Sequence, residues 1–404
     1  MNACTLPTIR VDHLPAAGRS LRIACVTETY PPEVNGVATT LARMVEGLHE
    51  RNHDVQLVRP RQPEGAGGGA APFEEVLLRG LPIPRYPNLR MGVPSKKALV
   101  QLWTRQRPDI VHIATEGPLG WSALAAARKL GVPVASDFHT NFHAYSRHYG
   151  VSWLARPVAA VLRSFHNRCD CTMVPTDEMA QDLAALGFER LRVVGRGVNA
   201  ATFSPARRRP ELRAQWGAEE ATPVALCVSR FAPEKNFPLV IDAYEAMRRA
   251  NPAVKLVLVG DGPLLAALRK QGTGTVIAGR LVNGELSAHY ASADVFLFPS
   301  VTETFGNVTL EAMASGLAVV AYRYAAARQH IEHGVSGLLA ESGDRAGFLA
   351  QAERLARDPA LARELGRAAR RAAEPVSWER ITLDFEAVLR DVQLAQADAV
   401  HAAA

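Results

Sequence analysis

The sequence predicts an α/β protein of two Rossmann-like domains, each built on a parallel sheet covered by helices. Its 404 residues exceed what one hydrophobic core normally serves. Short β-branched runs alternate with longer helical patterns along the whole chain, which is typical of parallel strands joined by crossover helices. Hydrophobic residues make up 48% and charged residues 21%, as in globular proteins.

In the first half, six apolar runs predict strands of one sheet. They are Leu21–Thr27, Val55–Val58, Ile110–Ala114, Val132–Asp137, Cys171–Val174 and Leu191–Val194. We assign residues 1–202 to this domain. Residues 1–19 contain no apolar signal-peptide core, so we interpret them as a flexible extension. The glycine-rich stretch Gly65–Gly69 is interpreted as a mobile loop inside the domain.

In the second half, six further runs predict a second sheet within residues 203–375. They are Val224–Ser229, Lys255–Val259, Val276–Ala278, Val295–Phe298, Ala318–Ala321 and Gly337–Leu339. The segment Gly195-Arg196-Gly197, followed by Ser204-Pro205 and the basic run Arg207–Arg209, has the composition of an exposed hinge. Residues 376–404 contain an amphipathic pattern from Trp378 to Val392, and we expect this helix to cross back to the first domain.

Cysteine content, hydropathy and charge narrow the class of protein. The five cysteines are odd in number and scattered, so no disulfide framework is expected; they are Cys4, Cys25, Cys169, Cys171 and Cys227. Cys169 and Cys171 have no matching His or Cys pair, which favours strand packing over metal binding. No apolar run is long enough to span a membrane, and a cytoplasmic protein is expected. The net charge of +6 suits a nucleotide diphosphate or an anionic membrane, although an arginine-rich proteome explains it equally well; no nucleic-acid partner is expected.

Two cations follow the first strand of the second domain. Open parallel sheets bind ligands at the carboxyl ends of their strands, so two facing sheets predict a cleft between those ends. Arg230 and Lys235 lie directly after Val224–Ser229, where they can grip both phosphates of a diphosphate. Solvated loop cations are the alternative interpretation.

Two glutamates follow the strand Val295–Phe298. Glu303 is predicted to lie in a loop, and Gly306 to let the backbone approach a ligand. Glu311 falls in a predicted helix, Val308–Ser315, whose N-terminus attracts phosphate. Carboxylates beside such a site suit ligands rich in hydroxyl groups. An ordinary surface pair of glutamates is the alternative.

These motifs, in this order, resemble the donor-binding half of glycosyltransferase family 4. The resemblance is carried by Ser229-Arg230, Glu234-Lys235-Asn236, Val259-Gly260-Asp261-Gly262-Pro263, the segment Ser300–Glu311 and Gly316. It implies a GT-B fold and a retaining hexosyltransferase that uses a nucleotide diphosphate sugar of the GDP-mannose or UDP-glucose type.

The resemblance also implies roles for these residues. Glu303 would bind the sugar hydroxyls and Glu311 the ribose hydroxyls, while Arg230 and Lys235 would hold the diphosphate and stabilise it as it leaves. The pocket would be lined by Phe305, Gly306, Asn307 and Val308, and the nucleobase would lie near Arg280.

The first domain resembles the family at two further places. In Glu28–Val37, Gly36 matches a glycine whose N–H approaches the donor phosphate, whereas Asn35 replaces a glycine and either contacts the acceptor or supplies a turn. His139, in Asp137–Phe142, matches the family's histidine loop and would contact the transferred sugar. Weaker acceptor-side candidates are His143, Tyr145 and Arg147; Arg196 could reach the phosphates or be an exposed hinge cation.

The acceptor is expected to be a hydroxyl group of a lipid or glycan. Relatives with a similar histidine loop include mannosyl, glucosyl and sulfoquinovosyl transferases that act on lipids. The helical pattern from Trp153 to Phe165, with nearby arginines, fits either a helix docked on the inner face of an anionic membrane or a helix with one buried face. No metal cofactor is expected, because the cations replace it and no Asp-x-Asp motif is present.

Two other classes are less favoured. A nicotinamide-dependent oxidoreductase should show Gly-x-Gly-x-x-Gly after an early strand, where this chain has Glu28-Thr29-Tyr30-Pro31-Pro32. A non-catalytic sugar-binding or nucleotide-binding protein of the same fold would not need Arg230, Lys235, Glu303 and Glu311 together.

Overall fold

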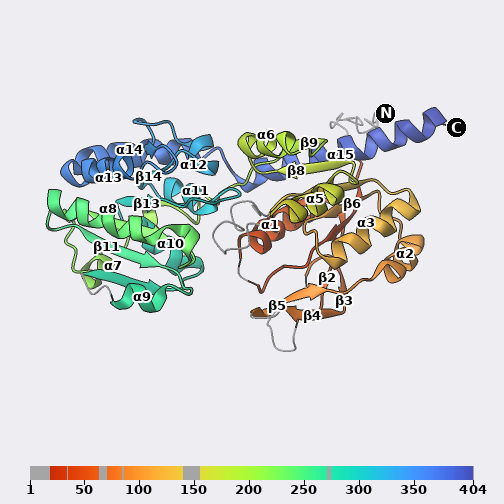
Figure 1. Cartoon of the computed structure of the whole chain (residues 1–404), viewed down its shortest axis with the longest axis horizontal. Coiled ribbons are helices and arrows are strands. Elements are labelled where there is room, and N and C mark those ends of the chain that lie inside the picture. The colour runs from red at the N-terminus through yellow and green to blue at the C-terminus, as the bar shows by residue number, and fades with distance from the viewer. Residues whose placement is uncertain are drawn as a thin grey trace, which may run out of the picture.

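The computed structural model describes residues 19–33, 35–62, 71–83, 86–139, 155–270 and 274–403, which form two lobes that lie side by side (Figure 1). Several predicted features lie outside the described residues, namely most of the N-terminal extension, the loop Gly65–Gly69, and His143, Tyr145, Arg147, Trp153 and Leu154.

The first lobe contains a seven-stranded parallel sheet with the strand order β3-β2-β1-β6-β7-β8-β9. Its inner strands are almost wholly buried because helices cover both faces of the sheet. The strands are β1 Arg22–Val26, β2 Asp54–Pro60, β3 Glu74–Leu78, β6 Ile110–Ile113, β7 Val134–Asp137, β8 Cys171–Val174 and β9 Leu191–Val193. The helices are α1 Gly36–Glu50, α2 Lys96–Arg105, α3 Pro118–Leu130, α5 Ala155–His166 and α6 Asp177–Ala185.

The sequence prediction missed strands at one edge of this sheet. β3 begins with Glu74 and Glu75 and is only partly buried, so it lacks the apolar run that marked the other strands. Charged, half-exposed edge strands are common because they discourage pairing with another chain. The antiparallel pair β4 Gly80–Ile83 and β5 Tyr86–Gly92 was also missed.

The second lobe contains a six-stranded parallel sheet with the order β12-β11-β10-β13-β14-β15, and all six expected strands are present. They are β10 Val224–Val228, β11 Lys255–Val259, β12 Thr275–Gly279, β13 Val295–Phe298, β14 Ala318–Tyr322 and β15 Leu338–Ala340. The helices are α7 Pro210–Gln215, α8 Phe237–Ala250, α9 Leu265–Lys270, α10 Asn283–Ser292, α11 Asn307–Ala314, α12 Ala325–His330, α13 Arg345–Arg357 and α14 Pro359–Ala373.

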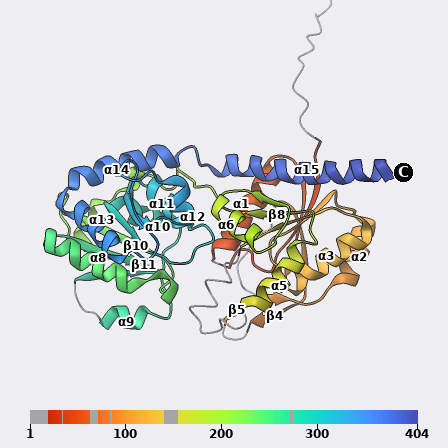
Figure 2. The same cartoon turned by 45° about the horizontal axis from the view of Figure 1, so that its top comes forward.

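A long last helix, α15 Trp378–Ala403, runs from the second lobe along the first (Figure 2). It packs against α1 and places Ile381, Phe385 and Leu389 in the core of the first sheet. This helix therefore supplies part of a core whose other residues all come from the N-terminal half of the chain.

The crossing between the lobes is not the exposed hinge that the composition suggested. Arg196 is 3% exposed, and the Val198 N–H donates to the Val376 carbonyl at 2.9 Å. A Cβ atom added to Gly197 would lie 2.7 Å from the Trp378 nitrogen. The prediction was wrong because the chain crosses twice and the two crossing segments, around Val198 and Ser377, pair with and cover each other.

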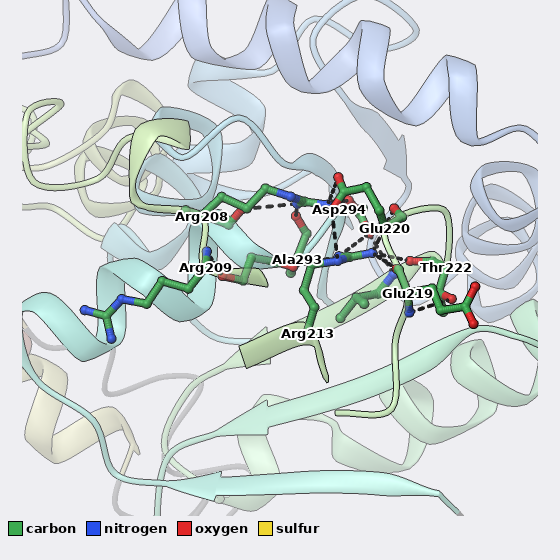
Figure 3. A network of polar contacts seen from close by, with 11 residues as sticks. Arg208, Arg209, Arg213, Glu219, Glu220, Thr222, Ala293 and Asp294 are labelled. Carbon is green, nitrogen blue, oxygen red and sulfur yellow. Dashed lines mark hydrogen bonds and ion pairs between the residues drawn. The ribbon is translucent and has the colours of Figure 1, made fainter. Parts of the chain in front are cut away.

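The basic run Arg207–Arg209 continues into a network that holds α7 to the sheet (Figure 3). Arg213 is 1% exposed, and its guanidinium donates to the Ser292 carbonyl at 2.8 Å, the Thr222 carbonyl at 2.6 Å and the Asp294 carboxylate at 3.1 Å. Arg208 also donates to Asp294 at 3.3 Å. Asp294 directly precedes β13, so this network lies at the amino end of that strand, opposite the predicted ligand-binding edge.

Candidate active site

The loops after β10 and β13 form the centre of the candidate site. The two strands are neighbours in the sheet, with Ala225 opposite Val295, so both loops leave the same edge. The Lys235 ammonium forms an ion pair with the Glu303 carboxylate, although 68 positions separate them in the sequence. The Lys235 Nζ also lies 5.8 Å from the centroid of the Phe298 ring. The structure thus brings together two of the residues that the sequence singled out.

Arg230 is held beside them by an acidic residue that the sequence analysis did not assign. Its guanidinium donates to the Glu234 carboxylate at 2.5 Å, and the Glu234 side chain is 1% exposed. Burial alone would raise the pKa of Glu234, but the hydrogen bond from Arg230 and the charges of Arg230 and Lys235 hold that pKa below its usual value. Glu234 is therefore an ionised anchor that orients Arg230.

Helix α11 begins beside the two cations Arg230 and Lys235. It starts one residue earlier than predicted. Gly306 is its N-cap, with a φ of 89° that disfavours any side chain. Phe305 is buried, and its carbonyl accepts a hydrogen bond from the Ala326 N–H at 2.9 Å, which fixes the turn into the helix. Asn307 and Val308 form its half-buried first turn, so the positive end of the helix dipole lies beside the Glu303 loop.

Glu311 lies one turn further along α11 and is half-buried. The Tyr290 hydroxyl, from α10, donates to its carboxylate at 2.9 Å. Burial raises the pKa of Glu311 to about 7, although the hydrogen bond from Tyr290 opposes that rise. The sequence analysis missed Tyr290, because nothing in the α10 sequence distinguishes it from an ordinary core aromatic.

The loop after β11 packs tightly on the loop that carries Arg230. A Cβ atom added to Gly260 would lie 1.9 Å from the Ser229 carbonyl oxygen, so this position accepts no side chain. The Phe231 N–H donates to the Asp261 carbonyl at 2.8 Å. Arg280 follows β12 and is exposed at the edge of the sheet, with β11 and β10 between its strand and β13.

In the first lobe, Gly36 and Asn35 mark the start of α1. The Asn35 side chain accepts a hydrogen bond from the Ala38 N–H at 2.9 Å and donates to the Thr29 hydroxyl at 2.8 Å. Asn35 is therefore the N-cap of α1, a role that the two alternatives, an acceptor contact and a turn, did not include. A Cβ atom added to Gly36 would meet nothing within 4 Å, so this glycine borders open space.

His139 follows β7 and is surrounded by protein groups. Its Nδ1 atom lies 3.4 Å from an Arg196 Nη2 atom, and its Nε2 atom lies 3.4 Å from an Asp137 carboxylate oxygen. Arg196 is thus a buried neighbour of His139 and not the exposed cation considered above.

The two lobes meet close to these groups. Glu178, in α6 of the first lobe, accepts hydrogen bonds from the Ala325 N–H at 3.1 Å and the Arg328 guanidinium at 2.8 Å, both in the second lobe. These residues line a pocket of about 260 Å³ that both lobes share. The Tyr324 hydroxyl donates to the Glu303 carbonyl at 2.9 Å, which links this junction to the Lys235–Glu303 pair.

Helix α5 buries one apolar side and exposes another. Leu162 and Phe165 pack inward, while Val161 is 56% exposed. Cys171 lies in β8 and Cys169 just before it, and both are buried thiols, which confirms the expected strand packing.

Within the described ranges, no helix combines the length and the apolar composition that a membrane span requires.

Two parallel sheets whose carboxyl edges meet at a shared junction have the architecture of the GT-B fold. The sucrose-phosphate synthase structure from Thermosynechococcus elongatus has this fold, with a TM-score of 0.74, 20% identity, and coverage of 93% of this chain and 100% of that chain. Residues 34–202 match the model of Glycosyltransferase Family 4, and residues 222–358 match Glycosyl transferases group 1. The chain belongs to glycosyltransferase family 4 and is an enzyme of the hexosyltransferase class.

Curated relatives support the same assignment. The chain is 34% identical over 327 residues to the GDP-mannose-dependent alpha-mannosyltransferase of Mycobacterium tuberculosis (strain CDC 1551 / Oshkosh), covering 80% of this chain and 85% of that protein. It is 28% identical over 325 residues to the alpha-monoglucosyldiacylglycerol synthase of Acholeplasma laidlawii, covering 74% of this chain and 80% of that protein.

Proposed function

We propose that this enzyme transfers a hexose, with retention of anomeric configuration, from a nucleotide diphosphate sugar to a hydroxyl group of a lipid or glycan. The observation that carries the proposal is the contact between Lys235 and Glu303 beside the N-terminus of α11. A cation and a helix N-terminus bind a diphosphate, and a carboxylate at the same place binds sugar hydroxyl groups.

The donor is bound by an exchange of partners. The diphosphate takes the Lys235 ammonium from Glu303, and the released Glu303 carboxylate accepts hydrogen bonds from the hexose. Glu234 keeps Arg230 oriented toward the second phosphate. Glu311 accepts from the ribose, and Gly36 approaches the phosphates from the first lobe.

Catalysis consists mainly of stabilising the departing nucleotide diphosphate. Arg230, Lys235 and the α11 dipole lower the energy of the leaving group, and the acceptor hydroxyl attacks from the same face of the sugar. Its proton passes to the leaving phosphate oxygen, so no protein base is assigned. The cations supply the charge that a metal ion supplies elsewhere, and we expect the rate to be unchanged by EDTA.

The names of the relatives motivate GDP-mannose or UDP-glucose as donor and a lipid as acceptor. A thermal-shift screen against GDP, UDP and ADP sugars tests the donor, because a bound ligand raises the unfolding temperature. We expect one nucleotide sugar to raise it and to be consumed when lipid or glycan acceptors are added, with product of the donor's own anomeric configuration. No shift with any of them, or an inverted product, would refute the proposal.

A further inference from the structure

A buried carboxylate lies behind His139 that the mechanism above does not use. Asp137, the last residue of β7, is 0% exposed. One of its carboxylate oxygens, Oδ2, lies 3.2 Å from the His112 Nε2 atom and 3.4 Å from the His139 Nε2 atom. His112 is itself fully buried on β6 and packs edge-on against Phe385 of α15, with the ring centroids 4.9 Å apart. The His139 ring thus faces a carboxylate whose position the core of the first lobe determines.

Arg196 contacts the other nitrogen of the same ring. Its Nη1 atom donates to the Val194 carbonyl at 2.9 Å and the Gly195 carbonyl at 3.0 Å, which fixes the plane of the guanidinium. Its Nη2 atom lies 3.4 Å from His139 Nδ1. A guanidinium only donates hydrogen bonds, so Nδ1 is the acceptor in this contact, which assigns the proton of a neutral His139 ring to Nε2, on the side of Asp137. Both ring nitrogens of His139 therefore face protein groups.

The charges in this cluster are balanced. Burial alone would raise the pKa of Asp137, but the contacts with His112 and His139 and the charge of Arg196 hold it well below its usual value. Burial lowers the pKa of Arg196, and the Asp137 charge opposes that shift. An ionised Asp137 and a protonated Arg196 form a buried pair of opposite charges, one at each ring nitrogen of His139.

A purely structural role does not account for this arrangement. A buried ionised carboxylate is costly unless its oxygens are hydrogen-bonded. Within the part of the chain that the structure describes, Asp137 Oδ1 has no hydrogen-bond partner, and the 3.4 Å contact between His139 Nε2 and Asp137 Oδ2 does not meet the geometry of a hydrogen bond. An unsatisfied buried polar group in a folded protein calls for an explanation, and a catalytic role is one such explanation.

We propose that Asp137 and Arg196 are positioning residues that fix the orientation and the tautomer of the His139 ring for sugar transfer. The proposal rests on the proposed function and on the role that the family resemblance gives His139, namely contact with the transferred sugar. It adds that two residues restrict the rotation of this ring, Asp137 at the end of β7 on one side and Arg196 after β9 on the other.

A double-mutant cycle tests whether Asp137 acts through His139. A misplaced contact costs about hundredfold in rate, so we expect Asp137→Asn to lower kcat by about that factor and to leave KM for the donor nearly unchanged. In a His139→Ala background the same change should have no further effect. Equal losses in both backgrounds, or no loss in the parent enzyme, would overturn the proposal. Asp294→Asn is the matched control, because it removes a carboxylate from another arginine network, and it should leave kcat unchanged.

A second measurement does not depend on turnover. Imidazole ¹⁵N NMR should show a protonated Nε2 and an unprotonated Nδ1 for His139 in the parent protein. Arg196→Gln, with its unfolding temperature as a check of folding, should remove that preference. A protonated Nδ1 in the parent, or an unchanged spectrum in Arg196→Gln, would refute the positioning role. If the ring has the expected tautomer but no nucleotide sugar is turned over, the proposed function fails and the positioning of the ring stands.

Discussion

At the scale of single residues, the contact between Lys235 and Glu303 gives each side chain a partner before substrate arrives. The two side chains are 15% and 14% exposed, so each ion would be poorly solvated alone. The pair keeps both charges at the carboxyl edge of the second sheet. A diphosphate can then replace Glu303 as the anionic partner of Lys235, and sugar hydroxyl groups can donate hydrogen bonds to the Glu303 carboxylate.

Removing either member of the pair should stop transfer without unfolding the protein. We expect Lys235→Ala to lower kcat/KM at least about hundredfold, because a lost charge contact to the leaving group costs that much. Glu303→Ala should be similarly damaging. Lys270→Ala, an exposed lysine of the same lobe, is the matched control and should behave like the parent. Steady-state kinetics with circular dichroism measures both effects, and parental turnover in Lys235→Ala would exclude the assigned role.

Glu311 predicts a pH dependence of donor affinity. Its pKa of about 7 means that the ionised form, which accepts hydrogen bonds from the ribose, becomes dominant as the pH rises. Affinity for an intact nucleotide sugar should increase roughly tenfold between pH 6 and pH 8, following the ionised fraction. Calorimetric titrations at several pH values measure this change.

Two variants separate Glu311 from other ionisable groups. Glu311→Gln should remove the pH dependence of affinity. Glu28→Gln is the control, because burial also raises the pKa of Glu28 to about 7. This variant should retain the pH dependence of affinity, since Glu28 lies against Gly92 and Gly117 in the first lobe. An unchanged pH profile in Glu311→Gln would exclude this explanation. The free energy of unfolding should change with pH in the opposite direction to donor affinity. Because the pKa of Glu311 is raised in the folded protein, its contribution to stability is present at low pH and is lost as the pH rises through about 7.

At the scale of elements, the start of α11 depends on Gly306. Its φ of 89° makes an alanine there unfavourable by on the order of 1 kcal/mol, and relief of that strain would move the helix N-terminus. Gly306→Ala should therefore lower both stability and nucleotide affinity. Gly343→Ala is a matched control, because Gly343 has a φ of 87° with open space around it and lies before α13. Equal nucleotide affinity in the two variants would contradict a role for the α11 terminus.

The network around α7 predicts a purely structural effect. Arg213→Met removes the donor of several buried carbonyls and one of the donors of the Asp294 carboxylate, which should destabilise the protein by about 3 kcal/mol. Arg209→Met removes only an exposed pair with Glu285 and should have no measurable effect. Denaturant unfolding measures both, and equal midpoints would mean that the buried network contributes nothing.

The elements that the sequence predicted well are those with a strong local pattern. Buried strands such as β1 and β13 are apolar on both faces, and the glycine-bounded start of α11 was placed to within one residue. The edge strand β3 was missed because Glu74 and Glu75 interrupt its apolar pattern. Tyr290 and Asp137 could not be assigned to the site, because their partners Glu311, His112 and Arg196 are distant in sequence. Glu234 is only four positions from its partner Arg230, but the sequence does not show that its side chain is buried.

At the scale of the whole molecule, the two lobes are joined by paired crossing segments and by the Glu178 contact. The composition of the Gly195–Gly197 segment could not show that a second crossing covers it, because that crossing lies almost 180 positions later in the sequence. Closure of the lobes over a donor would exclude water, which competes with the acceptor. The Glu178 contact with Ala325 and Arg328 is a direct link between the lobes in this state.

Loss of the Glu178 contact should loosen the arrangement of the lobes. We expect Glu178→Ala to increase the radius of gyration of the ligand-free protein in small-angle X-ray scattering. Glu189→Ala, whose carboxylate pairs with the adjacent Arg190 inside the first lobe, is the control. Identical scattering from Glu178→Ala and the parent would show that the contact does not hold the lobes.

The central claim is that Lys235 and Glu303 bind a nucleotide diphosphate sugar at the N-terminus of α11. Isothermal titration calorimetry of the parent protein and of Lys235→Ala with GDP-mannose and UDP-glucose tests it most directly. We predict saturable binding of one of these donors at one site in the parent, and a loss of affinity of about hundredfold in Lys235→Ala. Equal binding by the two proteins, or no binding of either donor by the parent, would contradict the claim.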